Sequence, residues 1–193
     1  MSSIGVAVTD NESLTDMVWA NAERFGDAVC FRRQEPDGWL DVTTREFAAE
    51  VLSVARGLLA AGRQPGERVP LGGTGYEWAV AQFAIWTAGC VSVPGPPADP
   101  DRLARDGQKV TDREVHARRL AVRAGDPATA DDTHRGLLGA VRTTVRRHPR
   151  LFGAGVSMLI RVPVDRPAAR MLALCGVYTR TTLALSPDAN LGM

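Results

Sequence analysis

Residues 67–94 read ERVPLGGTGYEWAVAQFAIWTAGCVSVP, and they decide the fold class. Two strand-like runs, ERVPL and CVSVP, enclose a helix-like apolar run, YEWAVAQFAIWTAG, and the loop GGTG joins the first strand to the helix. A strand, a helix and a second strand in this order form a βαβ unit, which implies parallel strands and a right-handed crossover. The first half of the chain is therefore predicted to be α/β.

The glycines of LGGTGYEW, residues 71–78, pose the question of nucleotide binding, since a loop at a helix N-terminus can cradle phosphate with its N–H groups. No lysine follows the glycines, and GGTGYE does not fit GxGxxG. Glu77 would repel a phosphate, whereas it suits the helix dipole. We therefore favour a tight strand-to-helix turn here over a phosphate site.

The residues before this unit predict two helices and a β-hairpin. Apolar side chains in 14–25 have helical spacing, and AVCFRR and WLDVT flank the turn EPDG, which indicates a hairpin over 28–43. Thr43 and Glu46 then have capping-box spacing, so a second helix is expected from there to Gly62.

The second half of the chain changes in character. Residues 95–110 concentrate proline, glycine and aspartate without an apolar stripe, which is typical of a linker. Helices are expected over 110–123, with Thr111 or Asp112 as N-cap, and over 133–148. VSMLIRVP predicts a buried strand, Pro167 opens another helix, and the closing residues contain one more short strand.

The composition matches a folded domain with no strong global charge. The 193 residues are 45% hydrophobic and 23% charged, with a formal net charge of +1. This charge supplies no global field for nucleic acid or an anionic membrane, so any such binding requires a local patch. The N-terminus lacks a basic start followed by an apolar core, and no apolar run is long enough to span a bilayer, which favours a cytoplasmic location.

Cysteine, histidine and serine give no pattern that indicates catalysis or metal binding. Cys30, Cys90 and Cys175 are widely spaced and are expected to be buried free thiols. The three histidines have no partner at ligand spacing, and Ser157 has no nucleophile elbow. We therefore assign no catalytic residue and no metal ligand.

A basic segment lies between residues 102 and 150, where twelve Lys and Arg stand against six Asp and Glu. This local excess of positive charge could contact phosphates. No aromatic residues are interleaved for base stacking, however, so a solvated surface without a nucleic-acid partner is the favoured interpretation.

The ordered series of segments resembles the N-terminal part of adenylate-forming (AMP-binding) enzymes, most closely the long-chain fatty-acyl-CoA synthetases. LTDMVWANAERFGDAVCFR, the hairpin, TTREFAAEVLSVARGLLAAGRQPGERV and YEWAVAQFAIWTAGCVSVP carry its opening, VTDREVHARRLAVRAGDPAT resembles the approach to the family's ATP loop, and THRGLLGAVRTTVRRHPRLFGAGVSMLIRVP resembles the stretch after that loop. The resemblance implies an incomplete N-terminal subdomain of the adenylate-forming α/β fold, with a parallel βαβ core and an N-terminal β-hairpin.

The resemblance also implies that a phosphate loop is missing. The family activates a fatty acid with ATP and Mg and passes the acyl group to CoA, and its loop, rich in Thr, Ser and Gly and ending in Pro-Lys-Gly, precedes a Thr-His pair. Here ATADD, residues 128–132, leads directly to Thr133 and His134, which flank the place where the loop belongs. Two carboxylates thus stand where a cation is required, so we expect no cofactor for this chain.

Further departures concern the acyl site and the domain boundaries. The family's PLxH stretch, whose histidine borders the acyl tunnel, matches residues 163–166, so Arg166 takes the histidine's position. The resemblance divides the chain into 1–94, an N-terminal α/β part of the AMP-binding domain, 95–110, a linker replacing a missing family segment, and 111–193, a remnant of the central part.

We interpret the chain as a shortened relative of the long-chain fatty acid–CoA ligases that does not carry out adenylation alone. Two alternatives remain open: a ligase component completed by another polypeptide, or a non-catalytic module that binds a full-length synthetase. Fatty acid and CoA are partners only by resemblance. Removing strands from a parallel sheet leaves its edges uncovered, which favours self-association.

Overall fold

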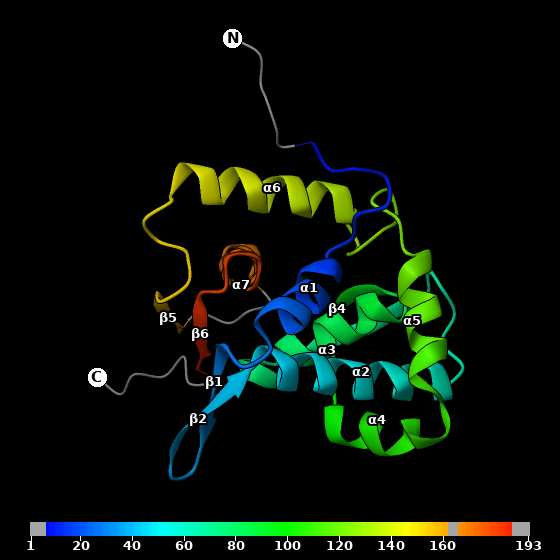
Figure 1. Cartoon of the computed structure of the whole chain (residues 1–193). Coiled ribbons are helices and arrows are strands. Elements are labelled where there is room, and N and C mark those ends of the chain that lie inside the picture. The colour runs from blue at the N-terminus through cyan, green and yellow to red at the C-terminus, as the bar shows by residue number, and fades with distance from the viewer. Residues whose placement is uncertain (1–6, 162–165, 187–193) are drawn as a thin grey trace.

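The computed structural model describes residues 7–161 and 166–186. In chain order its elements are α1 (Asp16–Phe25), β1 (Val29–Glu35), β2 (Gly38–Thr43), α2 (Thr44–Ala60), β3 (Arg68–Gly72), α3 (Gly75–Thr87), β4 (Val91–Pro97), α4 (Pro100–Asp106), the short 3₁₀ helix η1 (Gly107–Lys109), α5 (Asp112–Ala121), α6 (His134–Arg147), β5 (Ser157–Ile160), α7 (Pro167–Thr179) and β6 (Thr182–Leu185). Helices α2 and α3 run through the middle of the molecule, and α6 lies along its outer side, beyond α7 (Figure 1).

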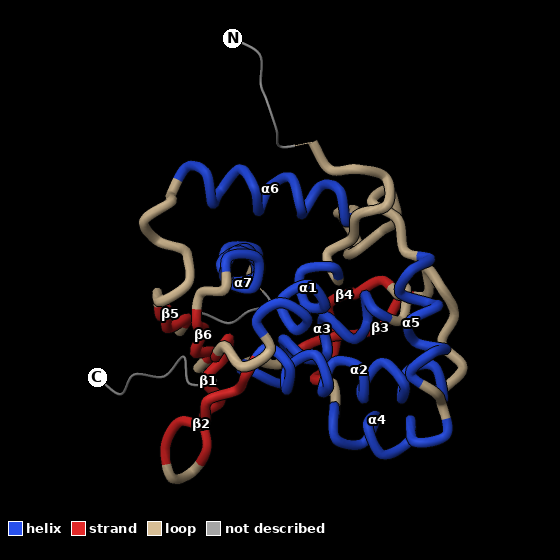
Figure 2. Tube along the Cα trace, in the orientation of Figure 1, coloured by secondary structure: helices blue, strands red, loops and turns tan. Residues whose placement is uncertain are grey.

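The strands form two separate sheets (Figure 2). The larger sheet has the order β2-β1-β6-β5, in which β1 and β2 are an antiparallel hairpin and β6 runs parallel to both β1 and β5. The smaller sheet consists of β3 and β4, which are parallel. The predicted hairpin and the predicted βαβ unit are both confirmed.

Helix α3 connects the two sheets and forms the centre of the core. It contacts β1 and β6 of the larger sheet and β3 and β4 of the smaller one, and 12 of its 13 residues are buried. Its sequence is apolar on nearly all sides, which is the pattern of a helix that is surrounded by protein. A chain of ring contacts links it to its neighbours, from Phe47 to Phe83 at 5.7 Å and from Phe83 to Trp86 at 5.3 Å.

The local start signals of the helices are confirmed. Thr43 and Glu46 form the reciprocal capping box at the start of α2, and Thr111 and Glu114 form another at the start of α5. Pro167 occupies the first turn of α7. These contacts satisfy N–H groups that a helix leaves unpaired at its N-terminus.

The segment that we expected to be a linker contains a helix packed on α2. The Asp99 side chain caps α4 by accepting a hydrogen bond from the Arg102 N–H at 2.9 Å. The approach to α2 is close, because a methyl group on Gly57 would lie 2.0 Å from the Leu103 carbonyl oxygen. No residue of α4 is buried, so the helix lacks the apolar stripe from which it could have been predicted.

The expectation of a buried strand in VSMLIRVP is wrong for the part that the structure describes. Strand β5 lies at the edge of the larger sheet, and Leu159 is 51% exposed. A hollow of about 300 Å³ lies over this face, lined by Arg32, Trp39, Ser157, Met158, Leu159, Thr182 and Ala184. A short apolar run indicates a strand but does not show whether another layer covers it.

We predict that Gly57→Ala lowers the free energy of unfolding by about 1–3 kcal/mol, because the added methyl group forces α4 away from α2. Gly139→Ala in α6 is the matched control: a methyl group there meets nothing within 4 Å, so we expect stabilisation by about 0.5–1 kcal/mol. Urea unfolding followed by tryptophan fluorescence measures both. Equal effects of the two substitutions would show that α4 is not docked on α2.

Candidate functional site

The glycine turn before α3 has a structural explanation. A methyl group on Gly72 would lie 2.0 Å from the Gly95 carbonyl oxygen, and Gly73 has a φ of 97°, which favours glycine. The Glu77 side chain folds back toward the glycine turn. Its Oε2 lies 3.2 Å from the position that a β-carbon would occupy if Gly75 had one. A carboxylate thus lies where a phosphate would bind, which supports a strand-to-helix turn.

Residues 128–132 form a closed turn in which four backbone N–H groups point inward. The N–H groups of Ala128 and Thr129 donate to the Asp132 carbonyl oxygen at 2.8 and 3.0 Å. Those of Asp131 and Asp132 donate to Thr129 Oγ1 at 3.4 and 3.1 Å. A phosphate nest requires N–H groups that face outward into one concavity, so this turn does not provide one.

The turn is anchored to the core through one carbonyl group. The Ala128 oxygen accepts hydrogen bonds from Trp86 Nε1 at 2.7 Å, from the Ser92 N–H at 3.1 Å and from Ser92 Oγ at 3.2 Å. Trp86 belongs to α3 and Ser92 to β4, so the βαβ unit determines the position of the turn.

The N-terminus of α6, where the Thr-His pair lies, is also closed. Thr133 is the N-cap, and the first three N–H groups of the helix, those of residues 134–136, donate to the Asp126 oxygen at 3.0 Å, the Ala124 oxygen at 2.7 Å and Thr133 Oγ1 at 3.1 Å. A helix N-terminus binds an anion through unpaired N–H groups, and these three are occupied.

His134 is a core residue. Its side chain is 1% exposed, its Nδ1 accepts a hydrogen bond from the Leu14 N–H at 3.2 Å, and its ring meets that of Trp86 edge-on at 5.9 Å. Burial away from water lowers the pKa of His134 to about 4, against the weaker opposing effect of the Asp126 carboxylate. The imidazole is therefore neutral near pH 7 and joins α6 to the segment before α1.

Arg166 is exposed and immediately precedes α7. Residues 163–165 of the PLxH-like stretch lie outside the described residues. Arg170, one turn further along α7, lines a cavity of about 70 Å³ at the carboxyl ends of β3 and β4. The other lining residues are Leu71, Trp78, Gln82, Ser92, Val93, Pro94, Thr129, Ala130 and Asp131.

This cavity has polar groups that sequence reasoning missed. Gln82 is 2% exposed, and within the described part of the chain its Nε2 has no hydrogen-bond partner. Arg170 and Asp131 bring opposite charges and form no ion pair with any described residue. The volume suits about two water molecules or a small polar group, against the roughly 300–1,000 Å³ of typical ligand pockets. The signal that could have revealed Gln82 is a single amide side chain within the apolar run AVAQFAIW.

The thiols are buried and free, as expected. Burial raises the pKa of Cys30 to about 12 and those of Cys90 and Cys175 to about 11, so all three are protonated near pH 7. Over residues 7–161 and 166–186, no group of three or more His, Cys, Asp or Glu side chains is arranged to hold a metal ion. None of the described helices has both the length and the apolar character needed to cross a membrane.

The family is shown by comparison with known proteins. Residues 18–118, more than half of the chain, match the family model described as AMP-binding enzyme. The chain belongs to this family. The resemblance to adenylate-forming enzymes and the incomplete N-terminal α/β fold are thereby confirmed.

A curated relative shows the extent of the match. The long-chain-fatty-acid–CoA ligase FadD15 of Mycobacterium tuberculosis is 25% identical over 247 aligned residues, covering 94% of this chain and 41% of that protein. The aligned length exceeds the 193 residues of the chain by 54, so at least that many aligned positions have no residue here. The chain thus spans about two fifths of the relative, and the alignment contains gaps on the side of this chain.

Solved structures share the fold at low identity. A long-chain-fatty-acid–CoA ligase from Archaeoglobus fulgidus matches with a TM-score of 0.74 and 16% identity, covering 95% of this chain and 49% of that one. The fatty acyl-adenylate ligase from Legionella pneumophila, solved with acyl adenylate and pyrophosphate, matches with a TM-score of 0.70 and 16% identity. The match covers 89% of this chain and 39% of that one. The domain boundaries and the roles of Thr133, His134 and Arg166 stay predictions.

We predict that His134 makes stability depend on pH. Since its folded pKa is about 4 against 6.5 in the unfolded chain, the unfolded state binds a proton that the folded state excludes. The free energy of unfolding should fall by about 3 kcal/mol as the pH drops from 6.5 to 4 through this group alone. Urea unfolding at several pH values measures this. The free energy of unfolding should depend more steeply on pH in the wild type than in His134→Gln over this range.

His148→Gln, which removes an exposed histidine at the other end of α6, is the control and should keep the wild-type slope. If His134→Gln and His148→Gln change the pH dependence equally, burial of His134 is not its cause.

Proposed function

We propose that this chain is a shortened relative of the long-chain fatty acid–CoA ligases that does not carry out adenylation by itself. The closed turn at residues 128–132 carries this proposal. Four of its five N–H groups are used within the turn, and the side chains of Asp131 and Asp132 are exposed. A triphosphate would therefore meet negative charge in place of N–H donors and a cation.

The residues around the turn do not fit ATP, the cofactor that the family implies. The N–H groups at the start of α6 are occupied, Glu77 covers the start of α3, and the adjacent cavity of about 70 Å³ is too small for a nucleotide. We therefore derive no catalytic step for this chain. Thr133 and His134 are proposed to be vestiges of the family's ATP site that now cap and anchor α6.

The acyl site is proposed to be altered as well. Arg166, which takes the position of the family's tunnel histidine by resemblance, carries a full charge at the start of α7. An apolar acyl chain beside this guanidinium would remove water from its charge, which is costly. Fatty acid and CoA thus remain partners of the family. For this chain we propose a cytoplasmic location on the basis of its three free thiols.

A second candidate function is binding to another protein. The chain would then be a ligase component that another polypeptide completes, or a non-catalytic module that binds a full-length synthetase. The observation that favours it is the apolar face beside β5, where Leu159 is 51% and Trp39 is 47% exposed. A large exposed apolar face is typical of an interaction surface, and an unpaired edge strand can accept a further strand. The same edge supports our proposal of self-association.

We predict no ATP–pyrophosphate exchange above background when the chain is incubated with a long-chain fatty acid and Mg-ATP, while a full-length synthetase gives exchange in the same assay. Calorimetric titration with Mg-ATP should show no heat of binding. Asp131→Asn combined with Asp132→Asn should not restore binding, because the inward N–H groups remain. Clear turnover by the isolated chain would overturn the proposal.

We predict that the face beside β5 binds a hydrophobic dye. Leu159→Lys should lower dye fluorescence and, if copies associate through this edge, should shift a dimer toward the monomer in sedimentation. Leu120→Lys changes another exposed leucine, 62% accessible on α5, and should leave both readings unchanged. A dye-silent wild-type monomer would remove the support for an interaction surface here.

A further inference from the structure

The segment that forms α6 and the following strand has an unusual charge pattern. Residues 133–161 contain six arginines and no aspartate or glutamate. Helix α6 buries Leu137, Leu138 and Val141, and it lies on the outside of the molecule, where it packs on α7 (Figure 1). Its polar residues are therefore displayed on the outer surface.

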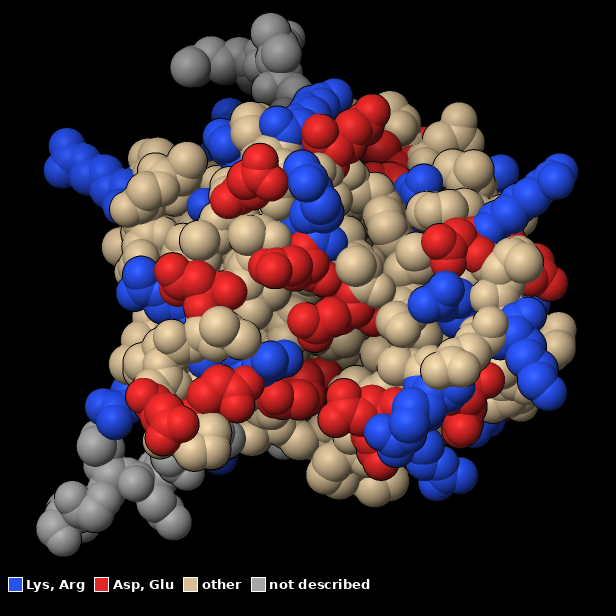
Figure 3. All heavy atoms as spheres, turned by 60° about the horizontal axis from the view of Figure 1, so that its bottom comes forward, with Lys and Arg blue, Asp and Glu red and all other residues tan. Residues whose placement is uncertain are grey.

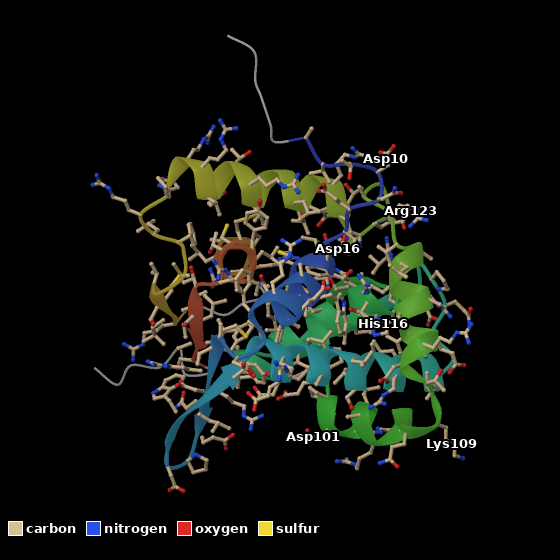
Figure 4. All side chains as sticks on the ribbon, in the orientation of Figure 1. Asp10, Asp16, Asp101, Lys109, His116 and Arg123 are labelled. Atoms are coloured by element: carbon tan, nitrogen blue, oxygen red, sulfur yellow. The ribbon has the colours of Figure 1, made fainter. Side chains whose placement is uncertain are left out.

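The first two arginines of this helix are neutralised by acids from the segment before α1. Arg135 pairs with Asp10, and Arg142 pairs with Glu12 at 2.5 Å. Figure 4 shows Asp10 beside the N-terminal end of α6. These two arginines have a structural role in holding the segment before α1.

The C-terminal end of the helix is different. Arg146, Arg147 and Arg150 are exposed and form no ion pair with any residue that the structure describes. Next to them Leu151 is 53% exposed. We call these four residues the arginine end of α6. The face over α2 and α4, in contrast, carries interspersed acidic and basic side chains (Figure 3).

Helix stability explains only part of this arrangement. Cations in the last turn of a helix interact favourably with its dipole, which accounts for Arg146 and Arg147. Arg150 lies beyond the helix, and Leu151 gains nothing from the dipole. Cations beside an exposed apolar side chain are instead the combination that adsorbs to the surface of an anionic bilayer.

We propose that the arginine end of α6 is a docking surface for a membrane rich in anionic lipid headgroups. The guanidinium groups would contact lipid phosphates, and Leu151 would enter the boundary between headgroups and acyl chains. Nucleic acid fits less well, because residues 146–151 include no Phe, Tyr or Trp side chain on which a base could stack. Membrane binding by this surface does not depend on adenylation, so its test is independent of the proposed function.

Flotation of the full chain with vesicles tests the proposal. We expect binding to vesicles of phosphatidylcholine and phosphatidylglycerol in equal parts, little binding to phosphatidylcholine alone, and release by high salt. Replacing Arg146, Arg147 and Arg150 by glutamine should lower the partition coefficient roughly 100-fold, or about fivefold for each arginine. Leu151→Ser should weaken binding without changing its salt dependence.

The control variant replaces Arg24, Arg105 and Arg113 by glutamine, which removes the same charge from exposed, unpaired arginines on α1, α4 and α5. It should bind like the wild type, and thermal unfolding should show that both triple variants are folded. Equal loss in both variants, equal binding to both vesicle types, or binding of a single-stranded RNA in place of the vesicles with the same arginine dependence would overturn the proposal.

Discussion

The burial of α3 is the constraint on which the rest of the structure depends. This helix has no polar face, so it is stable only when protein surrounds it. The larger sheet contacts it through β1 and β6, the smaller sheet through β3 and β4, and α2 and α5 add further contacts. The two sheets do not pair with each other, and α3 is what holds them in one core.

The turn that we propose in place of the ATP loop is tied to this same helix. Trp86 donates its indole N–H to Ala128, and its ring meets that of His134, so α3 positions both the turn and the start of α6. Conversion of the turn into an open phosphate loop would leave a buried indole N–H without its acceptor, which costs free energy. The closed form of the turn is therefore tied to the packed core through Ala128, although Asp131 and Asp132 lie at the surface.

Local signals predicted most of the elements, while α4 and the long-range contacts escaped prediction. Capping pairs such as Thr43 and Glu46 act between residues three apart, so the sequence alone revealed them. Helix α4 docks through a backbone approach at Gly57, and β6 lies between β1 and β5 although it comes last in the chain. The cavity beside Gln82 is likewise lined by residues of α3, β4 and α7, and no local sequence pattern predicts that these elements lie next to one another.

The hydrogen bonds around residues 124–136 explain how a chain with so short a turn can still form this core. The turn pairs four of its five N–H groups, and the carbonyl oxygens of Ala124 and Asp126 accept the first two N–H groups of α6. This turn, which we propose stands in place of the family's loop, thus leaves few backbone groups unpaired. At β5 of the larger sheet, in contrast, no described element covers the apolar face, and Leu159 stays exposed. On our proposal that the chain is shortened, the cost in stability falls on the apolar face of that sheet, while the turn at residues 128–132 is closed at little cost.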